Sequence, residues 1–220
     1  MYKYLLFDLD GTLFDTSAGV LRSVQYALGK MGLPVPEAEA LRCFIGPPLT
    51  DIFAEFCGFS REEAVRATAI YRERYSVTGV LEVAPYPGIP ELLAELDAAG
   101  FVIAVATGKP APFSPQILHN HGFDRYVKAI ATPELDGTRS EKCELIHCVL
   151  DELGVSAAEY GEVVMIGDRK FDITGAHEAG VAAIGVRYGF APAGELEAHG
   201  ADFVVDTVAD LRRLLLEGRA

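Results

Sequence analysis

The chain has 220 residues, of which 50% are hydrophobic and 23% charged, and its formal net charge is −13. This composition is that of a globular protein and excludes disordered, collagen-like and low-complexity classes. The negative charge argues against nucleic acids and anionic membranes as partners, because both bind basic surfaces. No apolar stretch approaches the roughly 18 residues of a membrane span, and no signal peptide opens the chain, so we expect a soluble, cytoplasmic protein.

The charges are divided unevenly along the chain. Residues 16–84 hold 7 Lys and Arg against 8 Asp and Glu, a net charge of −1, whereas the remainder holds 12 against 24, a net charge of −12. An almost neutral segment inside a strongly acidic chain indicates two structural units.

The first predicted element is a short buried strand over residues 2–9, a run of β-forming residues too brief for a helix. A helix follows, and a second is expected after Pro48. A third helix is predicted to begin at a capping box formed by Ser60 and Glu63. Residues 16–78 are therefore expected to form helix after helix, with no strand.

From residue 85 onward, the pattern changes to strands that alternate with helices. Buried strands are predicted at residues 101–108, 127–131, 162–168, 182–186 and 203–205. Nearly continuous apolar strands separated by helices predict a parallel sheet covered on both faces. We expect an α/β fold with a Rossmann-like, doubly wound core of residues 1–15 and 85–220, and an inserted all-α cap of residues 16–84.

Polar side chains gather at the carboxyl ends of three predicted strands, where open α/β sheets bind their ligands. These residues are Asp8 and Asp10, Thr107 and Lys109, and Asp168 and Asp172, with Lys142 at the start of a helix between the second and third strand ends. Four carboxylates brought together repel one another unless a cation compensates them. Mg²⁺ suits such oxygen ligands. A carboxylate cluster with one lysine and one threonine hydroxyl also describes a phosphoryl site, in which the cation and the ammonium neutralise phosphate oxygens.

These residues carry a resemblance to a known family. The segment 8–12, DLDGT, resembles the first motif, DxDGT, of the haloacid dehalogenase superfamily of Mg²⁺-dependent phosphohydrolases. Thr107 is similar to the second motif of that superfamily, Lys142 to the third, and the segment 167–172, GDRKFD, to the fourth. The helical insertion resembles the C1 cap of the superfamily, and the nearest likeness is to its phosphoglycolate phosphatase-like branch.

The resemblance implies a catalytic role for four residues. Asp8 would be the nucleophile that becomes an aspartyl phosphate. Asp10 would protonate the departing alkoxide and then accept a proton from the attacking water. Thr107 would donate a hydrogen bond to a phosphoryl oxygen, and Lys142 would bridge that oxygen and the nucleophile.

The resemblance also implies a Mg²⁺ site. Its ligands would be Asp8, the backbone carbonyl of Asp10, and Asp168, with Asp172 acting through water or through contacts to the ligands. Weaker expectations of substrate contact fall on Lys109, Phe44, Gly46 and Arg72.

The predicted function is a Mg²⁺-dependent phosphohydrolase that releases phosphate from a small phosphomonoester, such as phosphoglycolate, a nucleotide or a sugar phosphate. Two alternatives stay open. A sugar phosphomutase of the same family uses both aspartates but keeps water from the aspartyl phosphate. A non-catalytic phospho-ligand-binding member would be expected to lack a motif residue, and none is missing. The expected partner is a small phosphorylated metabolite, and the expected assembly is a monomer or homodimer.

Overall fold

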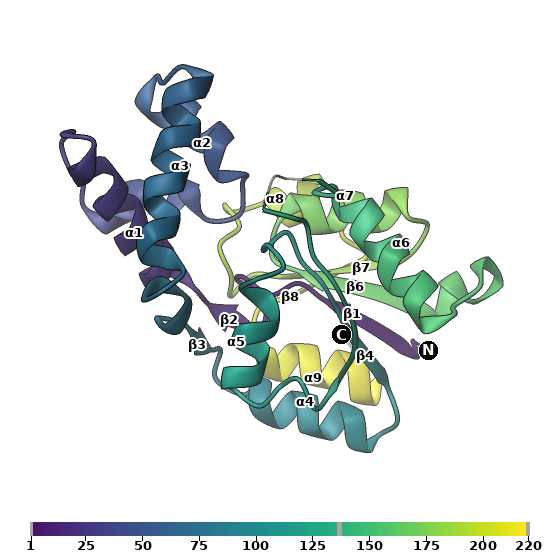
Figure 1. Cartoon of the computed structure of the whole chain (residues 1–220). Helices are drawn as coiled ribbons and strands as arrows, with labels where there is room; N and C mark the ends of the chain where they lie inside the picture. Colours follow the sequence, from purple (N-terminus) through teal and green to yellow (C-terminus); the bar gives the residue numbers. More distant parts are fainter. Residues whose placement is uncertain (1, 136–137, 219–220) are drawn as a thin grey trace. The chain divides into compact units, whose positions relative to one another are not determined.

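The chain forms two compact units in a computed structural model that describes residues 2–135 and 138–218. Residues up to 14 and from 85 onward make up the core unit, and residues 15–84 make up the inserted unit. The two crossings between the units are the short strands β2 (Phe14–Asp15) and β3 (Ala84–Pro85), which pair with each other. The inserted unit thus begins and ends at one small two-stranded sheet (Figure 1).

In the described residues, the core unit contains a six-stranded sheet in the order β5-β4-β1-β6-β7-β8, and the pairings are parallel. Its strands are β1 (Tyr4–Phe7), β4 (Val102–Ala106), β5 (Val127–Ala131), β6 (Val163–Gly167), β7 (Ala182–Val186) and β8 (Phe203–Val205). This confirms the predicted α/β class. The chain leaves β1 toward β4 on one side and returns at β6 on the other, so β1 lies at the topological switch point, where such sheets bind ligands.

The register of β1 aligns the carboxyl ends of three strands. Phe7 lies opposite Val105 of β4 and opposite Ile166 of β6. The residues that follow these strands therefore start at the same level of the sheet.

Helices cover both faces of the sheet, with α6 and α7 on one face and α4 and α9 on the other (Figure 1). The helices of the core unit are α4 (Ile89–Ala98), α5 (Ser114–Asn120), α6 (Lys142–Leu153), α7 (Lys170–Glu178), α8 (Glu195–Ala198) and α9 (Val208–Glu217). Between the sheet and the α6–α7 layer lies one cluster of buried apolar side chains, among them Leu6, Ala104, Ile146, Met165 and Ile173. Because both faces are buried in this way, the strands need apolar residues at successive positions.

The inserted unit is built from α1 (Ser17–Lys30), α2 (Leu49–Cys57) and α3 (Arg61–Tyr75), with short 3₁₀ helices at Ala38–Phe44 and Gly79–Leu81. The predicted capping box is confirmed, since the Glu63 N–H donates to Ser60 Oγ at 3.3 Å and the Ser60 N–H donates to Glu63 Oε2 at 2.8 Å. The absence of strands between residues 16 and 78 is also confirmed, because every residue of that range is described. The sequence did not predict the 3₁₀ helix before α2.

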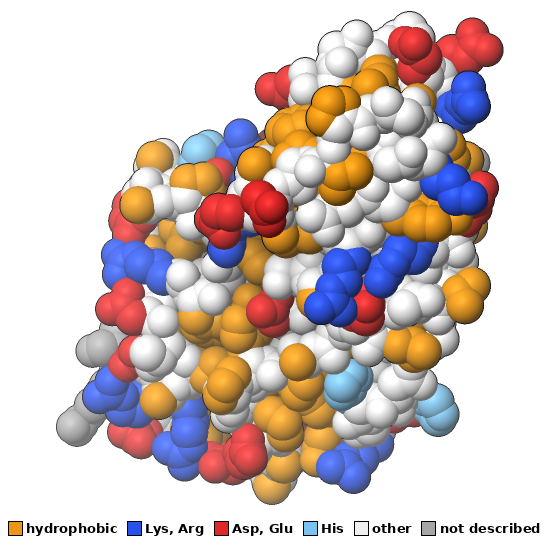
Figure 2. Space-filling model, turned by 90° about the vertical axis from the view of Figure 1, so that its left-hand side faces the viewer, with side chains coloured by type: hydrophobic (Ala, Val, Ile, Leu, Met, Phe, Trp, Pro, Cys, Tyr) orange, Lys and Arg blue, Asp and Glu red, His pale blue; other side chains and the backbone are white. Residues whose placement is uncertain are grey.

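Acidic and basic side chains are intermixed on the face shown in Figure 2. Among the described residues, several acidic and basic side chains form exposed ion pairs, such as Arg212 with Glu95 at 2.6 Å. Exposed pairs of this kind contribute little to stability. Within the described part of the chain, no helix is long and apolar enough to cross a membrane.

Gly19 marks a close backbone approach within the inserted unit. A Cβ at this position of α1 would lie 2.1 Å from the carbonyl oxygen of Gly79. We expect Gly19→Ala to lower the free energy of unfolding by about 1–3 kcal/mol, because a backbone oxygen cannot move aside alone. The matched control is Gly29→Ala on the same helix, whose Cβ would meet only Val35 Cγ2, at 3.6 Å. That control should gain roughly 0.5–1 kcal/mol from helix propensity, and equal urea midpoints for both variants would contradict the packing argument.

Candidate active site

Three buried aspartates meet at the carboxyl edge of the sheet. Asp8 directly follows β1, Asp168 directly follows β6, and Asp172 lies in the first turn of α7. One carboxylate oxygen from each lies within 4.8 Å of the others, and the residues are only 7%, 0% and 2% exposed. The structure therefore brings together three of the predicted site residues.

Lys142, the first residue of α6, joins this cluster. Its ammonium Nζ lies 2.8 Å from Asp8 Oδ1 and 2.7 Å from Asp172 Oδ1, and it donates to the Ala106 carbonyl oxygen at 3.0 Å. Three acceptors match the three protons of an ammonium group. Burial lowers the pKa of Lys142, but the attraction of the two carboxylates outweighs burial, so the net pKa is raised. The lysine is held in its charged form.

Asp168 is fixed at one oxygen and open at the other. The backbone N–H of Phe190 donates to Asp168 Oδ2 at 2.7 Å, whereas Oδ1 is buried with no hydrogen-bond partner among the described residues. Burial, and then repulsion from Asp172 and Asp8, raise the pKa of Asp168 well above its ordinary range. A buried carboxylate oxygen without a donor is the kind of group that a cation satisfies.

Asp172 is engaged at both oxygens. Oδ1 pairs with Lys142, and Oδ2 accepts the backbone N–H of Arg169 at 3.0 Å, at the N-terminus of α7. Burial raises the pKa of Asp172 to about 6, with Asp8 adding to the rise and Lys142 opposing it. The cap residue of α7 is Arg169 and not Asp168, so helix capping does not account for the position of Asp168.

The cluster fits a hard divalent cation. Its donors are all oxygens, as Mg²⁺ prefers. Three carboxylates and one ammonium leave a formal charge of −2 if all are ionised. Gly11 also allows close approach, since a Cβ there would lie 2.1 Å from Asp168 Oδ2. A bound cation would relieve both the excess charge and the unpaired oxygen.

Asp10 and Thr107 are both linked to Lys109. The Lys109 ammonium lies 2.8 Å from Asp10 Oδ2, and the Lys109 backbone N–H donates to Thr107 Oγ1 at 3.2 Å. The other oxygen of Asp10 is buried and accepts no hydrogen bond from the described residues. Lys109, predicted as a substrate contact, is therefore paired with the side chain predicted to be the acid and base.

The remaining predicted contacts lie in the inserted unit. Phe44 is 2% exposed, and its ring lies 4.9 Å from that of Phe53 and 5.2 Å from that of Phe56. Gly46 is exposed with a φ of 107°, and Arg72 is half-buried on α3. Phe44 thus belongs to the interior of the inserted unit.

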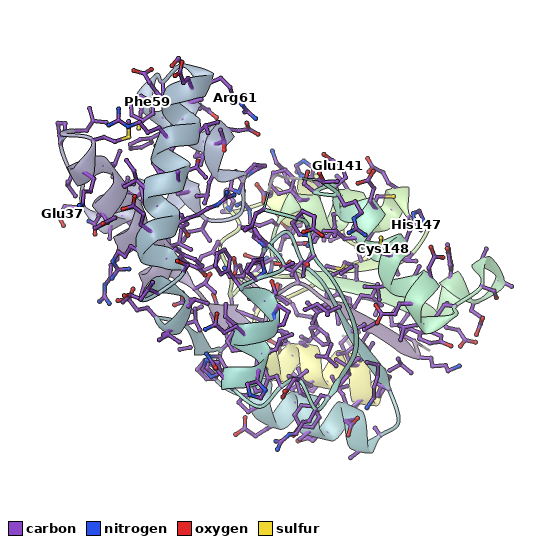
Figure 3. All side chains as sticks on the ribbon, viewed as in Figure 1. Glu37, Phe59, Arg61, Glu141, His147 and Cys148 are labelled. Atoms are coloured by element: carbon purple, nitrogen blue, oxygen red, sulfur yellow. The ribbon has the colours of Figure 1, made fainter. Side chains whose placement is uncertain are left out.

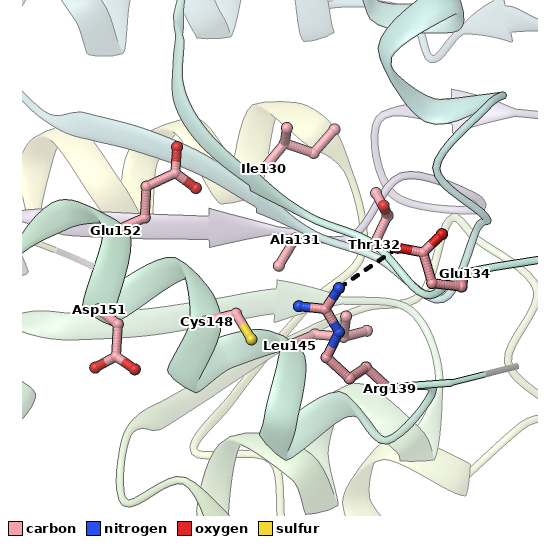
Figure 4. Close-up of a pocket in the computed structure, with 9 residues that line it drawn as sticks. All are labelled: Ile130, Ala131, Thr132, Glu134, Arg139, Leu145, Cys148, Asp151 and Glu152. Carbon is pink, nitrogen blue, oxygen red and sulfur yellow. Dashed lines mark hydrogen bonds and ion pairs between the residues drawn. The ribbon is translucent and has the colours of Figure 1, made fainter.

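A cavity of about 410 Å³ lies outside the carboxylate cluster, beside α6 at the end of β5 (Figure 4). Its rim carries an ion pair between Arg139 and Glu134 at 3.5 Å. Cys148, one of its lining residues, lies on the body of α6 together with His147, and Glu141 precedes the helix (Figure 3). None of the predicted site residues lines this cavity.

Three contributors to the site were not predicted from the sequence. Two are backbone groups, the carbonyl of Ala106 and the N–H of Phe190, of a kind that nearly every residue carries whatever its side chain. The third is Gly175 on α7, where a Cβ would lie 2.6 Å from Lys142 Cβ. A glycine inside a predicted helix is the signal that could have indicated this close packing.

The arrangement defines an α/β protein whose switch-point strands present a buried cluster of acids and a lysine, suited to a cation and to phosphate oxygens. The family model of haloacid dehalogenase-like hydrolases matches residues 5–186. The chain therefore belongs to the haloacid dehalogenase-like hydrolases, as its motifs predicted.

Known relatives and solved structures are similar to the chain over nearly its whole length. A 5′-nucleotidase of Pseudomonas aeruginosa is 47% identical, over 97% of this chain and 96% of the relative. The tyrosine-protein kinase PtkA of Mycobacterium tuberculosis is 35% identical, over 97% of this chain and 72% of the relative. The crystal structure of a predicted phosphatase from Clostridium acetobutylicum has a TM-score of 0.91 at 39% identity, covering 99% of both chains. Phosphoglycolate phosphatases are also among the relatives, so the predicted enzyme class, a phosphatase-type hydrolase, is confirmed at the level of the family.

The raised pKa of Asp168 predicts a pH-dependent stability in the metal-free protein. Folding favours the protonated form, so this stabilising contribution is present at low pH and is lost as the pH rises through the folded-state pKa. In EDTA, we expect Asp168→Asn to gain stability relative to the wild type as the pH rises from 5 to 8. The gain should approach roughly 1.4 kcal/mol per pH unit between the unfolded-state and the folded-state pKa of Asp168, where only the folded protein holds the proton. Parallel curves of melting temperature against pH for the two proteins would contradict this assignment.

Proposed function

We propose that this protein is a Mg²⁺-dependent phosphatase that acts on a small phosphomonoester through an aspartyl phosphate formed on Asp8. The observation that carries the proposal is the contact between Asp8 and Lys142 at 2.8 Å, inside a buried group of acids at the switch point of the sheet. The Lys142 ammonium orients Asp8 and places a positive charge beside the oxygen that would attack phosphorus.

In the first step, a carboxylate oxygen of Asp8 attacks phosphorus. A bond forms between that oxygen and phosphorus, and the bond from phosphorus to the ester oxygen breaks in line. Asp10 gives a proton to the departing alkoxide from Oδ1, the oxygen that accepts no hydrogen bond from the described residues, while Oδ2 faces Lys109. Asp8 and Asp10 are two residues apart at the end of a strand, a spacing that favours side chains on the same side.

In the second step, water attacks the phosphorus of the aspartyl phosphate. Asp10, now a carboxylate, accepts a proton from that water, and the bond between phosphorus and the Asp8 oxygen breaks. Inorganic phosphate leaves, and Asp8 returns to the carboxylate form. Together the two steps convert the phosphomonoester and one water molecule into an alcohol and inorganic phosphate, and they return Asp8 and Asp10 to their starting forms.

Mg²⁺ would be held by Asp8, Asp168 and the backbone carbonyl of Asp10. When bound, it supplies positive charge that neutralises phosphoryl oxygens and draws the phosphoryl group toward the nucleophile. Asp172 would hold Lys142 in place, because its Oδ1 contacts the lysine at 2.7 Å. The hydroxyl oxygen of Thr107 accepts the Lys109 N–H at 3.2 Å, which leaves its proton available for a phosphoryl oxygen.

The proposed substrates are small phosphorylated metabolites. The relative named 5′-nucleotidase supports nucleoside 5′-monophosphates, and the relatives named phosphoglycolate phosphatase and N-acetylmuramic acid 6-phosphate phosphatase support small organic and sugar phosphates. The near-neutral inserted unit, with 7 basic against 8 acidic residues in 16–84, suits an anionic substrate better than an acidic one would. A cytoplasmic location, where such metabolites occur, is part of this proposal.

The experiment that tests the function is phosphate release across a panel of nucleoside 5′-monophosphates, 2-phosphoglycolate and sugar phosphates, with Mg²⁺ or with EDTA. Selective, Mg²⁺-dependent release supports the proposal and identifies the substrate class. Isomerised sugar phosphate without phosphate release would replace it with a phosphomutase, and binding without either product would replace it with a phospho-ligand-binding role.

Asp8→Asn should abolish turnover, because the amide is no nucleophile at phosphorus, while circular dichroism should stay that of the folded protein. The matched control is Asp97→Asn, which neutralises an exposed carboxylate that pairs with Lys128 at 3.5 Å. That control should keep wild-type turnover. Turnover retained in folded Asp8→Asn would remove Asp8 as the nucleophile.

Thr107→Ala should lower kcat by about 100- to 1,000-fold, or roughly 2.7–4 kcal/mol, if its hydroxyl binds the phosphoryl group in the transition state. Thr107→Ser keeps the hydroxyl and should recover most of the rate. Steady-state kinetics of both variants measure this difference, and equal losses would show that the threonine methyl group, and not its hydroxyl, is required.

A further inference from the structure

The segment that follows β7 connects two of the loops that carry the acids. The Tyr188 hydroxyl donates to the Thr12 carbonyl oxygen at 3.2 Å, in the loop after β1. The Phe190 N–H donates to Asp168 Oδ2 at 2.7 Å, after β6. The ring of Tyr188 is itself supported edge-on by Tyr86, with 5.0 Å between the ring centroids.

Gly189 lies between these two hydrogen bonds, and its lack of a side chain is a requirement of space. A Cβ at this position would lie 2.4 Å from Asp168 Cβ and 2.4 Å from the carbonyl oxygen of Gly11. Its φ lies outside the left-handed region, so backbone conformation alone would admit another residue. Neither neighbour can yield by rotating, because one is a backbone oxygen and the other is the first atom of a fully buried side chain. Glycines at such positions permit close backbone approach.

The close packing of Gly189 on Asp168 matters because it accompanies the hydrogen bond that orients the Asp168 carboxylate. With Oδ2 held by a backbone donor, the carboxylate has a fixed orientation, and its buried Oδ1 has no hydrogen-bond partner in the described part of the chain. Groups that orient a metal ligand in this way typically change metal affinity by about 10- to 100-fold when they are removed.

We propose that Tyr188, Gly189 and Phe190 form a clasp that positions Asp168 for a divalent cation. Gly189 is the residue whose missing side chain allows this segment to pack directly against Asp168. The inference rests on the cation site of the proposed function and adds positioning residues to it. The hydroxyl of Tyr188 anchors the clasp, the N–H of Phe190 holds Oδ2, and Oδ1 remains the oxygen available to the cation.

The test is a titration with Mn²⁺, an oxygen-seeking stand-in for Mg²⁺, in which electron paramagnetic resonance measures the free ion directly. Gly189→Ala should bind Mn²⁺ about tenfold more weakly or worse than the wild type. The matched control is Gly161→Ala in the same unit, where a Cβ would meet nothing within 4 Å. The control should bind as the wild type does.

A structural role in folding alone would lower the melting temperature without this loss of affinity, so wild-type affinity in folded Gly189→Ala overturns the proposal. If Gly189→Ala does not fold, Tyr188→Phe replaces it, because it removes only the hydrogen bond to Thr12. A loss of about threefold or more in Mn²⁺ affinity then supports the clasp, and an unchanged affinity overturns it. A wild-type protein that binds no Mn²⁺ would instead overturn the cation site itself.

Discussion

The ammonium of Lys142 lies 2.8 Å from Asp8 and 2.7 Å from Asp172, in a region from which water is almost excluded. Buried charges are tolerated only when they are paired and hydrogen-bonded, and the loss of one partner leaves the other uncompensated. Here one ammonium contacts two of the three clustered carboxylates, so the pairing alone does not balance the charge. The surrounding backbone groups, such as the N–H of Arg169 on Asp172, compensate part of the remainder. The remaining negative charge suits this edge of the sheet to a cation, which would in turn neutralise phosphate oxygens.

This balance depends on how rigidly the charged groups are held. Asp8 and Asp168 follow strands whose register is set by continuous pairing from Tyr4 to Phe7. Lys142 and Asp172 lie in the first turns of α6 and α7, which pack against each other and against the sheet. Side chains mounted on packed elements hold their geometry better than side chains on loops. The apolar layers of the core unit therefore serve the chemistry by fixing distances between charges.

The sequence predicted the alternating elements of the core unit and the cluster of Asp8, Lys142 and Asp168, because buried strands and charges at their ends are unusual enough to notice. It did not predict the 3₁₀ helix at Ala38–Phe44, which lacks the periodicity of a longer helix. Nor did it predict that Lys109 pairs with Asp10. That contact depends on the path of two loops from different strands, and residue type alone does not determine such a path. The backbone donors and acceptors that join the site cannot be recognised from the sequence either, since nearly every residue carries such groups.

The pairing of β2 with β3 has a consequence for how this architecture can change. The inserted unit of residues 15–84 leaves and rejoins the core at two strands that are hydrogen-bonded neighbours. For the core unit, the insertion therefore acts as a tight turn would, because β2 and β3 pair with each other and hold the two ends of the insertion together. A longer insertion adds only a small further entropic cost to the free energy of folding, because the cost of closing a loop grows slowly with its length. The insertion can therefore differ in length or content without changing how the core closes at β2 and β3.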